Sequence, residues 1–199
     1  MIQPPVYHPF AMIIRENGRE IVNNPLVLEN GRYRMDFEHM RKAVRGCGMF
    51  ILCNPHNPAG RVWSREELEK IADICLRNGV FVVADEIHCE LVYPGHRYTP
   101  FASLSEEALL HSVTCISPSK AFNLAGIQIA NIVAADEEVR KKIDRAINVN
   151  EVCDVNSFAV DALVAAYGEG EEWLEELKRY LYGLSLIHIS EPTRRVVIS

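Results

Sequence analysis

The sequence lacks several features that would place a protein in a special class. No uninterrupted apolar stretch approaches the roughly 20 residues that a helix needs to span a bilayer. The first ten residues, MIQPPVYHPF, lack the charged-then-apolar order of a signal peptide. Internal repeats and low-complexity segments are also missing. These absences favour a soluble cytoplasmic protein with an ordinary packed core.

Positive charge is scarce, and it is scattered along the chain. The 199 residues include 21 Lys and Arg against 27 Asp and Glu, which gives a formal net charge of -6. Nucleic acids and anionic membranes are bound through clusters of Lys and Arg, and this chain has no such cluster. We therefore expect neither a nucleic acid nor a membrane as a partner.

Cysteine is present, but not at the spacing of a metal or disulfide framework. No CxxC pair occurs, and several cysteines lie inside apolar runs, where cysteine behaves as a small hydrophobic residue. The six are Cys47, Cys53, Cys75, Cys89, Cys115 and Cys153. This usage fits the reducing cytoplasm, and we predict no metal site. A zinc site from His88, Cys89 and His96 is the alternative, but no second close pair of ligands supports it.

Hydrophobic residues make up 48% of the chain, enough for one sizeable core. Many of them form short continuous apolar runs, which are typical of strands buried on both faces of a sheet. The predicted strands are residues 49–53, 80–84, 112–116 and 127–134. A tract rich in turn formers, residues 16–31, predicts a short hairpin ahead of them.

Helical patterns separate or follow these runs. Residues 36–45 have apolar side chains at helical spacing after Asp36, a suitable N-cap. Between residues 64 and 79, Ser64 and Glu67 have the spacing of a capping box. Further helices are predicted at residues 137–148, 157–170 and 171–183.

Strands joined by helical crossovers predict an α/β fold with a mostly parallel sheet and helices on both faces. Ligands of such sheets bind beyond the carboxyl ends of the strands. Three polar clusters lie at these ends: NPHNPAG (54–60), DEIH (85–88) and SPSK (117–120). We therefore expect the three clusters to meet at one edge of the sheet.

Each cluster alone has an ordinary structural explanation. Asn-Pro pairs form turns, an Asp at a strand end can cap a helix, and a loop lysine is usually solvated. Together, the clusters supply an acid, an amide, an imidazole, two hydroxyls and a lysine. That set suits pyridoxal phosphate, because lysine can form its Schiff base, a carboxylate can keep its ring nitrogen protonated, and hydroxyls can hold its phosphate.

The motifs PVY, NPHNPAGRVW, ADEIH and SPSKAFNLAG, in this order, resemble the fold-type-I, class I/II aminotransferase superfamily. The DEIH and SKAFNLAG motifs are most similar to its cystathionine β-lyase branch. The resemblance covers residues 1–183 and implies part of the large, cofactor-binding domain of a pyridoxal-phosphate enzyme.

The resemblance also implies roles for individual residues. Lys120 corresponds to the Schiff-base lysine, which later moves the Cα proton. Asp85 corresponds to the carboxylate beside the ring nitrogen, and Asn57 to the amide that donates to the phenolic oxygen. His88 stands where many relatives carry a tyrosine that meets the same oxygen.

The remaining site residues follow from the same motifs. Ser117 and Ser119 match hydroxyls on the phosphate side, and Tyr7 falls where an aromatic ring stacks on the cofactor. A tyrosine at a strand end, with its hydroxyl in water, is the structural alternative for Tyr7. Gln128 departs from the pattern, because aminotransferases commonly carry a phosphate-binding arginine there.

Family chains are about twice as long as this one. The resemblance places their glycine-containing phosphate loop before residue 1 and their substrate-binding arginine after residue 183. Residues 184–199, LSLIHISEPTRRVVIS, have no amphipathic period and resemble translated sequencing-adapter sequence. We expect this segment to be a foreign or disordered tail that does not continue the preceding helix.

The implied function is a C–S β-lyase that releases thiol, pyruvate and ammonia from cystathionine or related cysteine conjugates. An aminotransferase that uses the same residues is the alternative, and a non-catalytic regulatory relative is a second one. The expected partners are a small amino-acid substrate and, for the full-length enzyme, a second copy in a homodimer.

Overall fold

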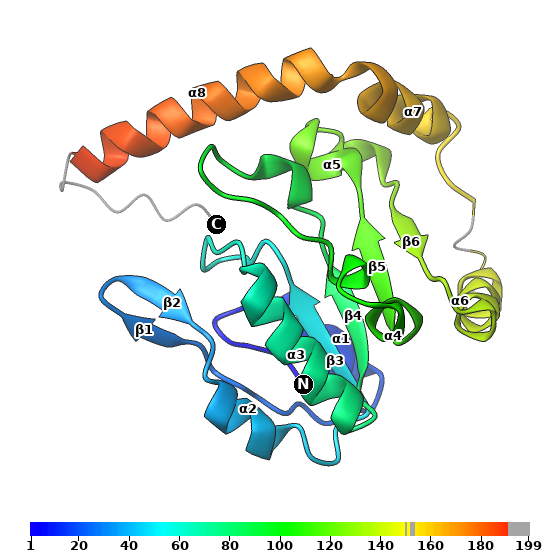
Figure 1. Cartoon of the computed structure of the whole chain (residues 1–199). Coiled ribbons are helices and arrows are strands. Elements are labelled where there is room, and N and C mark those ends of the chain that lie inside the picture. The colour runs from blue at the N-terminus through cyan, green and yellow to red at the C-terminus, as the bar shows by residue number, and fades with distance from the viewer. Residues whose placement is uncertain (150, 152–153, 191–199) are drawn as a thin grey trace.

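A computed structural model of the chain describes residues 1–149, 151 and 154–190, with only the backbone for residues 186–190. Figure 1 shows a central sheet with helices around it and a long C-terminal helix across one side. The strands are β1 (Val27–Glu29), β2 (Arg32–Arg34), β3 (Met49–Cys53), β4 (Phe81–Asp85), β5 (Ser112–Ile116) and β6 (Asn131–Val133). The helices are α1 (Pro9–Glu16), α2 (Phe37–Ala43), α3 (Arg65–Arg77), α4 (Glu106–Leu110), α5 (Pro118–Ala121), α6 (Glu137–Val149), α7 (Ala159–Glu169) and α8 (Glu171–Ser190), with 3-10 turns η1 (Cys89–Leu91), η2 (Phe101–Ser103) and η3 (Ala125–Ile127).

The main sheet has the strand order β3-β4-β5-β6. β3 pairs with β4, and β4 with β5, in parallel, which confirms the mostly parallel sheet that the sequence predicted. β6 runs antiparallel to β5, because the chain turns back after α5 and η3 without a long crossover helix. The register places Cys53 opposite Asp85, and Asp85 opposite Cys115.

Both predicted helix caps are present. The Ser64 hydroxyl accepts a hydrogen bond from the Glu67 backbone N–H at 3.2 Å, and the Glu67 carboxylate accepts one from the Ser64 N–H at 2.8 Å. Asp36 accepts a hydrogen bond from the His39 N–H at 2.8 Å and so begins α2. A cap of this kind stabilises a helix by about 1 kcal/mol.

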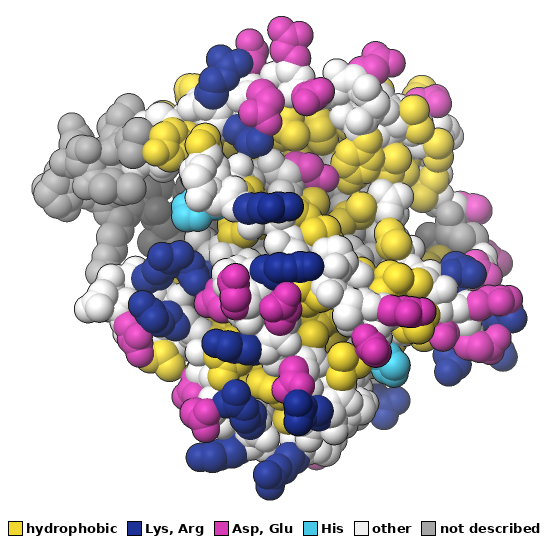
Figure 2. All heavy atoms as spheres, in the orientation of Figure 1, with side chains coloured by type: hydrophobic (Ala, Val, Ile, Leu, Met, Phe, Trp, Pro, Cys, Tyr) yellow, Lys and Arg dark blue, Asp and Glu magenta, His cyan; other side chains and the backbone are white. Residues whose placement is uncertain are grey.

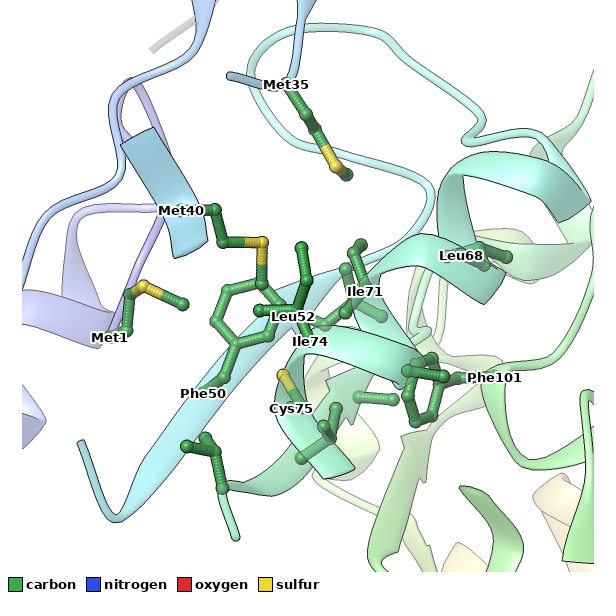
Figure 3. Packing of buried hydrophobic residues seen from close by; sticks show 14 of the residues in the cluster. Met1, Met35, Met40, Phe50, Leu52, Leu68, Ile71, Ile74, Cys75 and Phe101 are labelled. Carbon is green, nitrogen blue, oxygen red and sulfur yellow. The ribbon is translucent and has the colours of Figure 1, made fainter. Parts of the chain in front are cut away.

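The main core lies between β3, β4 and the helices α2 and α3 (Figure 3). Phe50 and Leu52 of β3 are fully buried there and contact side chains of α3. The alternate residues Ile51 and Cys53 pack on the opposite face with Phe10 of α1. Helices therefore cover both faces of β3, as predicted, since successive strand side chains point to opposite faces.

The turn-rich tract forms the predicted hairpin only at its end. β1 and β2 pair antiparallel across Asn30 and Gly31, whose φ angles are +50° and +75°. Such a two-residue turn needs a positive φ at both positions, which Asn and Gly adopt more readily than other residues. Helix α1, by contrast, was not predicted from the sequence. Its N-cap residue, His8, makes no side-chain capping hydrogen bond.

The prediction that the last helix ends at residue 183 was wrong, because α8 continues to Ser190. Residues 184–190 contain neither proline nor glycine, so nothing in their sequence stops the helix. Residues 191–199 of the predicted tail, and Cys153, lie outside the described residues.

Metal and membrane sites receive no support from the part of the chain that the structure describes. Within it, no group of three or more His, Cys, Asp or Glu side chains could hold a metal ion, so His88, Cys89 and His96 do not form the alternative zinc site. No helix among these residues is long and apolar enough to cross a membrane. On the face drawn in Figure 2, acidic and basic side chains are interspersed.

One buried polar side chain makes the fold sensitive to acid. His56 is 3% exposed, its ring contacts Trp63 edge to face, and neither ring nitrogen has a hydrogen-bond partner among the described residues. Burial lowers the pKa of His56 from 6.5 to about 4. The folded protein therefore holds this imidazole neutral.

We predict that His56 contributes to acid unfolding. Because the unfolded chain binds a proton at pH 6.5 and the folded chain does not until about pH 4, about 3 kcal/mol of stability is lost as the pH falls between these values. In His56→Gln, urea unfolding measured from pH 7 to pH 4 should show a smaller loss. His111→Gln, at an exposed position, is the control and should match the wild type. Equal losses in wild type and His56→Gln would contradict this assignment.

Candidate active site

A cavity of about 450 Å³ opens at the carboxyl ends of β3, β4 and β5. All the site residues that the sequence suggested line it: Tyr7, Asn57, Asp85, His88, Ser117, Ser119 and Lys120. Parallel pairing explains the convergence, because it brings the three strand ends to one edge of the sheet. Cavities that bind small molecules are usually of this size.

Lys120 lies on α5, a single helical turn directly after β5. Ser117 is the N-cap of that turn: its hydroxyl accepts a hydrogen bond from the Ser119 N–H at 3.1 Å and donates one to the Ile129 carbonyl at 2.6 Å. The Ser117 proton is therefore already engaged within the protein. Among the described residues, the Ser119 hydroxyl has no partner, so it is the freer of the two to meet a ligand.

Asp85 is the last residue of β4 and is partly buried. One carboxylate oxygen accepts a hydrogen bond from the Ile87 N–H at 3.2 Å, which fixes the direction of the side chain. Burial raises the pKa of Asp85, while this hydrogen bond and the nearby His88 and Lys120 act in the opposite direction. A cation bound against the carboxylate would favour its charged form.

His88 lies three residues after Asp85, at the start of η1. Burial lowers the pKa of His88, and the Asp85 carboxylate offsets part of that effect. The imidazole is therefore neutral at neutral pH. A neutral imidazole has one N–H donor and one nitrogen acceptor, so it can donate a hydrogen bond to an oxygen in the cavity.

The loop that carries Asn57 is anchored by Asn54, a residue that the sequence did not single out from its motif. Asn54 is fully buried, and its backbone N–H donates to the Asp85 carbonyl at 3.0 Å. Its side chain accepts from the Trp63 N–H at 3.2 Å and donates to the Thr99 carbonyl at 3.2 Å. Asn54 thus joins the loop to the strand end beside it.

Glu86 stabilises the surrounding chain, although it directly follows the candidate site residue Asp85 in the sequence. It is fully buried, and its carboxylate accepts hydrogen bonds from the Phe101 N–H at 2.8 Å and from the Tyr98 hydroxyl. Burial raises the pKa of Glu86, and these two donors favour the charged form. Glu86 therefore holds the segment that follows η1 in place.

Two lining residues complete the walls. Tyr7 is 47% exposed, and its ring contacts Phe10 edge to face with centroids 5.7 Å apart. Gln128, at the position where an arginine is common, also lines the cavity. A second cavity of about 710 Å³ shares Asn57 and His88 with the first.

The set of side chains fits pyridoxal phosphate. An amine, a carboxylate, a neutral imidazole and an amide can meet the aldehyde, ring nitrogen and phenolic oxygen of that cofactor. A hydroxyl and an aromatic ring remain for its phosphate and its face. The absence of a cation at position 128 leaves the described lining short of positive charge for the phosphate.

Comparisons with known proteins show the family of this chain. The family described as "Aminotransferase class I and II" matches residues 1–184. Among curated proteins, the chain is 48% identical over 183 residues to cystathionine beta-lyase PatB of Bacillus subtilis, covering 91% of this chain and 47% of that protein. It is 36% identical to a putative cystathionine beta-lyase of Mycobacterium tuberculosis, covering 91% of this chain and 45% of the relative.

The chain is also similar to proteins whose structures have been solved. A putative aminotransferase with bound pyridoxal phosphate from Clostridium difficile has a TM-score of 0.92 and 41% identity, covering 95% of this chain and 50% of its own. Cystalysin from Treponema denticola, which contains pyridoxal 5′-phosphate, has a TM-score of 0.87 and 33% identity, covering 89% of this chain and 46% of its own.

The chain spans about half the length of the curated relatives it matches. The family match nevertheless covers nearly all of the chain and includes every residue of the cavity. The chain therefore belongs to the class I and II aminotransferase family of enzymes.

Proposed function

We propose that this chain holds pyridoxal 5′-phosphate in the 450 Å³ cavity and is part of a C–S β-lyase. The reaction is β-elimination from cystathionine or a related cysteine conjugate, which releases thiol, pyruvate and ammonia. One observation carries the proposal: Lys120, Asp85 and Asn57 line one cavity in a chain 48% identical to a cystathionine β-lyase.

The bound cofactor would supply an electron sink for the electron pair left at the substrate Cα. Lys120 would hold the cofactor covalently through its amine. Once displaced by the amino group of the substrate, the same amine would take the proton from Cα. The position of Lys120 on the cavity wall, directly after a buried strand, supports both roles.

Asp85 would pair with the protonated ring nitrogen. The raised pKa of the buried carboxylate supports this role, because a buried charge favours an opposite charge beside it. Asn57 and neutral His88 would donate to the phenolic oxygen. Ser117 and Ser119 remain candidates for the phosphate side, and Tyr7 for stacking on the ring.

An aminotransferase is the second candidate, because it uses the same groups to return the proton to a different carbon. The similarity to a putative aminotransferase at 41% identity favours this alternative. A non-catalytic relative is less favoured, since Lys120, Asp85 and Asn57 are all retained at one cavity.

Three features of the whole protein are also proposals. A homodimer is supported by exposed apolar side chains of α7, such as Val160 and Val164, and sedimentation tests it. A cytoplasmic location is supported by the five free cysteines among the described residues, and cell fractionation tests it. The family match ends at residue 184, which supports a foreign origin for the part of the 184–199 tail that follows it; the flanking genomic sequence tests this.

The lyase proposal predicts products that need no second substrate. With cystathionine and added cofactor, the full-length enzyme that contains this chain should release thiol and pyruvate without any keto acid, and Lys120→Ala should abolish the release. Lys141→Ala, an exposed position on α6, is the matched control and should leave it unchanged. The B. subtilis PatB protein provides the positive control for the assay. Turnover that requires a keto acid would favour the aminotransferase instead.

A second prediction concerns the charge of Asp85. Asp85→Asn should weaken cofactor binding about 10- to 100-fold at pH 8, because a charge-assisted hydrogen bond is lost. Since the pKa of Asp85 is raised, wild-type affinity should fall toward that of the variant as the pH decreases and the carboxylate is protonated. Absorbance titrations with the cofactor at pH values from 8 to 5 measure both the loss of affinity in Asp85→Asn and the pH dependence of wild-type affinity.

The control for this titration is Asp73→Asn on α3, whose exposed side chain pairs with Arg77 away from the cavity. Titration of the cofactor phosphate affects every variant alike, so the comparison isolates Asp85. Parallel pH curves for wild type and Asp85→Asn would contradict the assignment.

A further inference from the structure

We propose that Cys53 is a positioning residue of the cofactor site: its thiol fixes the Asn57 backbone, and its place beside Asp85 gives that carboxylate an uncharged neighbour. The proposal rests on the proposed function in one respect, because Asn57 and Asp85 are the groups assigned there to the cofactor. The effect of the thiol on the Asn57 backbone N–H can be measured without the cofactor.

The location of Cys53 links both groups. It is the last residue of β3, is 3% exposed, and lines the 450 Å³ cavity. In the parallel register it lies directly opposite Asp85 on β4. One side chain thus stands between the strand end that carries the carboxylate and the loop that carries the amide.

The thiol makes two hydrogen bonds within that loop. The Cys53 Sγ accepts one from the Asn57 N–H and donates one to the Pro55 carbonyl, each at 3.4 Å. Sulfur is a weak donor and a weak acceptor, but among the described residues the Asn57 N–H has no other partner and would be unpaired without it. These two hydrogen bonds close the turn between residues 53 and 57 and fix the position of the Asn57 backbone.

The ionisation state of the thiol suits this role. Burial raises the pKa of Cys53 to about 12, and the Asp85 charge adds to the effect, while the Asn57 N–H opposes it. The S–H donor is therefore retained at neutral and moderately alkaline pH. Cys53 therefore adds no negative charge next to Asp85 in this range.

Cys75 offers a matched control. It is also buried, at 1% exposed, and burial likewise raises its pKa to about 12. It lies on α3 in the main core, and among the described residues its thiol makes no hydrogen bond. Replacing Cys75 removes a buried sulfur without touching the cavity, so it measures the cost of lost packing alone.

The experiment compares Cys53→Ala, Cys53→Ser and Cys75→Ala in two measurements. Without cofactor, amide hydrogen exchange of Asn57 followed by NMR should be about three- to tenfold faster in Cys53→Ala. With pyridoxal phosphate, the dissociation constant of Cys53→Ala should rise by a similar factor. Cys53→Ser keeps a donor and an acceptor and should lie closer to wild type, and Cys75→Ala should change neither quantity.

Three results would overturn the proposal. They are unchanged Asn57 exchange in Cys53→Ala, a Cys53→Ser variant that behaves like Cys53→Ala, or effects of Cys75→Ala as large as those of Cys53→Ala. If Cys53→Ala does not fold, Cys53→Ser against Cys75→Ser decides by the same two readouts. Failure of the wild type to bind the cofactor would sink the proposed function, and the exchange measurement would still decide whether Cys53 holds Asn57.

Discussion

The parallel pairing of β3, β4 and β5 is the constraint on which the rest of the site depends. Its register places Cys53, Asp85 and Cys115 in one row across the strand ends. The loops that follow each strand therefore begin at the same edge, and the residues that they carry face one cavity. A slip of one residue in β4 would turn Asp85 to the opposite face and exchange it with Glu86.

Successive side chains of a strand point to opposite faces of the sheet, so the adjacent acids Asp85 and Glu86 have different surroundings. Asp85 faces the cavity, where burial leaves its charge without a full partner. Glu86 points the other way and is satisfied by Phe101 and Tyr98. The two carboxylates therefore differ: Glu86 stabilises the surrounding chain, and we propose that Asp85 meets a positively charged ligand.

Much of the fold could be predicted because its signals are local. Short apolar runs predicted β3, β4 and β5 to within one residue, and the Ser64 and Glu67 capping pair predicted the start of α3. Helix α1 escaped prediction because it lacks a capping signal and is held by the packing of Phe10. The end of α8 was wrong because a change of amphipathic pattern does not stop a helix that lacks proline and glycine.

Residues that line the cavity could be predicted from the sequence, but the residues that anchor its loops could not. The sequence motifs named seven of the residues that line the cavity, and six of these seven lie in polar clusters at strand ends. Asn54 and Glu86 anchor the site through hydrogen bonds to Thr99 and Phe101, which lie far along the chain. The Cys53 thiol bonds within its own loop, and its role depends on the face that this strand residue takes. Those partners are fixed only when the sheet forms, so composition and spacing did not reveal them.

The proposed chemistry depends on Lys120 as the lysine that holds the cofactor. The most direct measurement incubates the chain with an equimolar amount of pyridoxal phosphate, reduces it with borohydride, and maps the labelled peptide by mass spectrometry. We expect the label to lie on Lys120. Label that is absent from Lys120, or spread evenly over Lys42, Lys70, Lys141, Lys142 and Lys178, would contradict it.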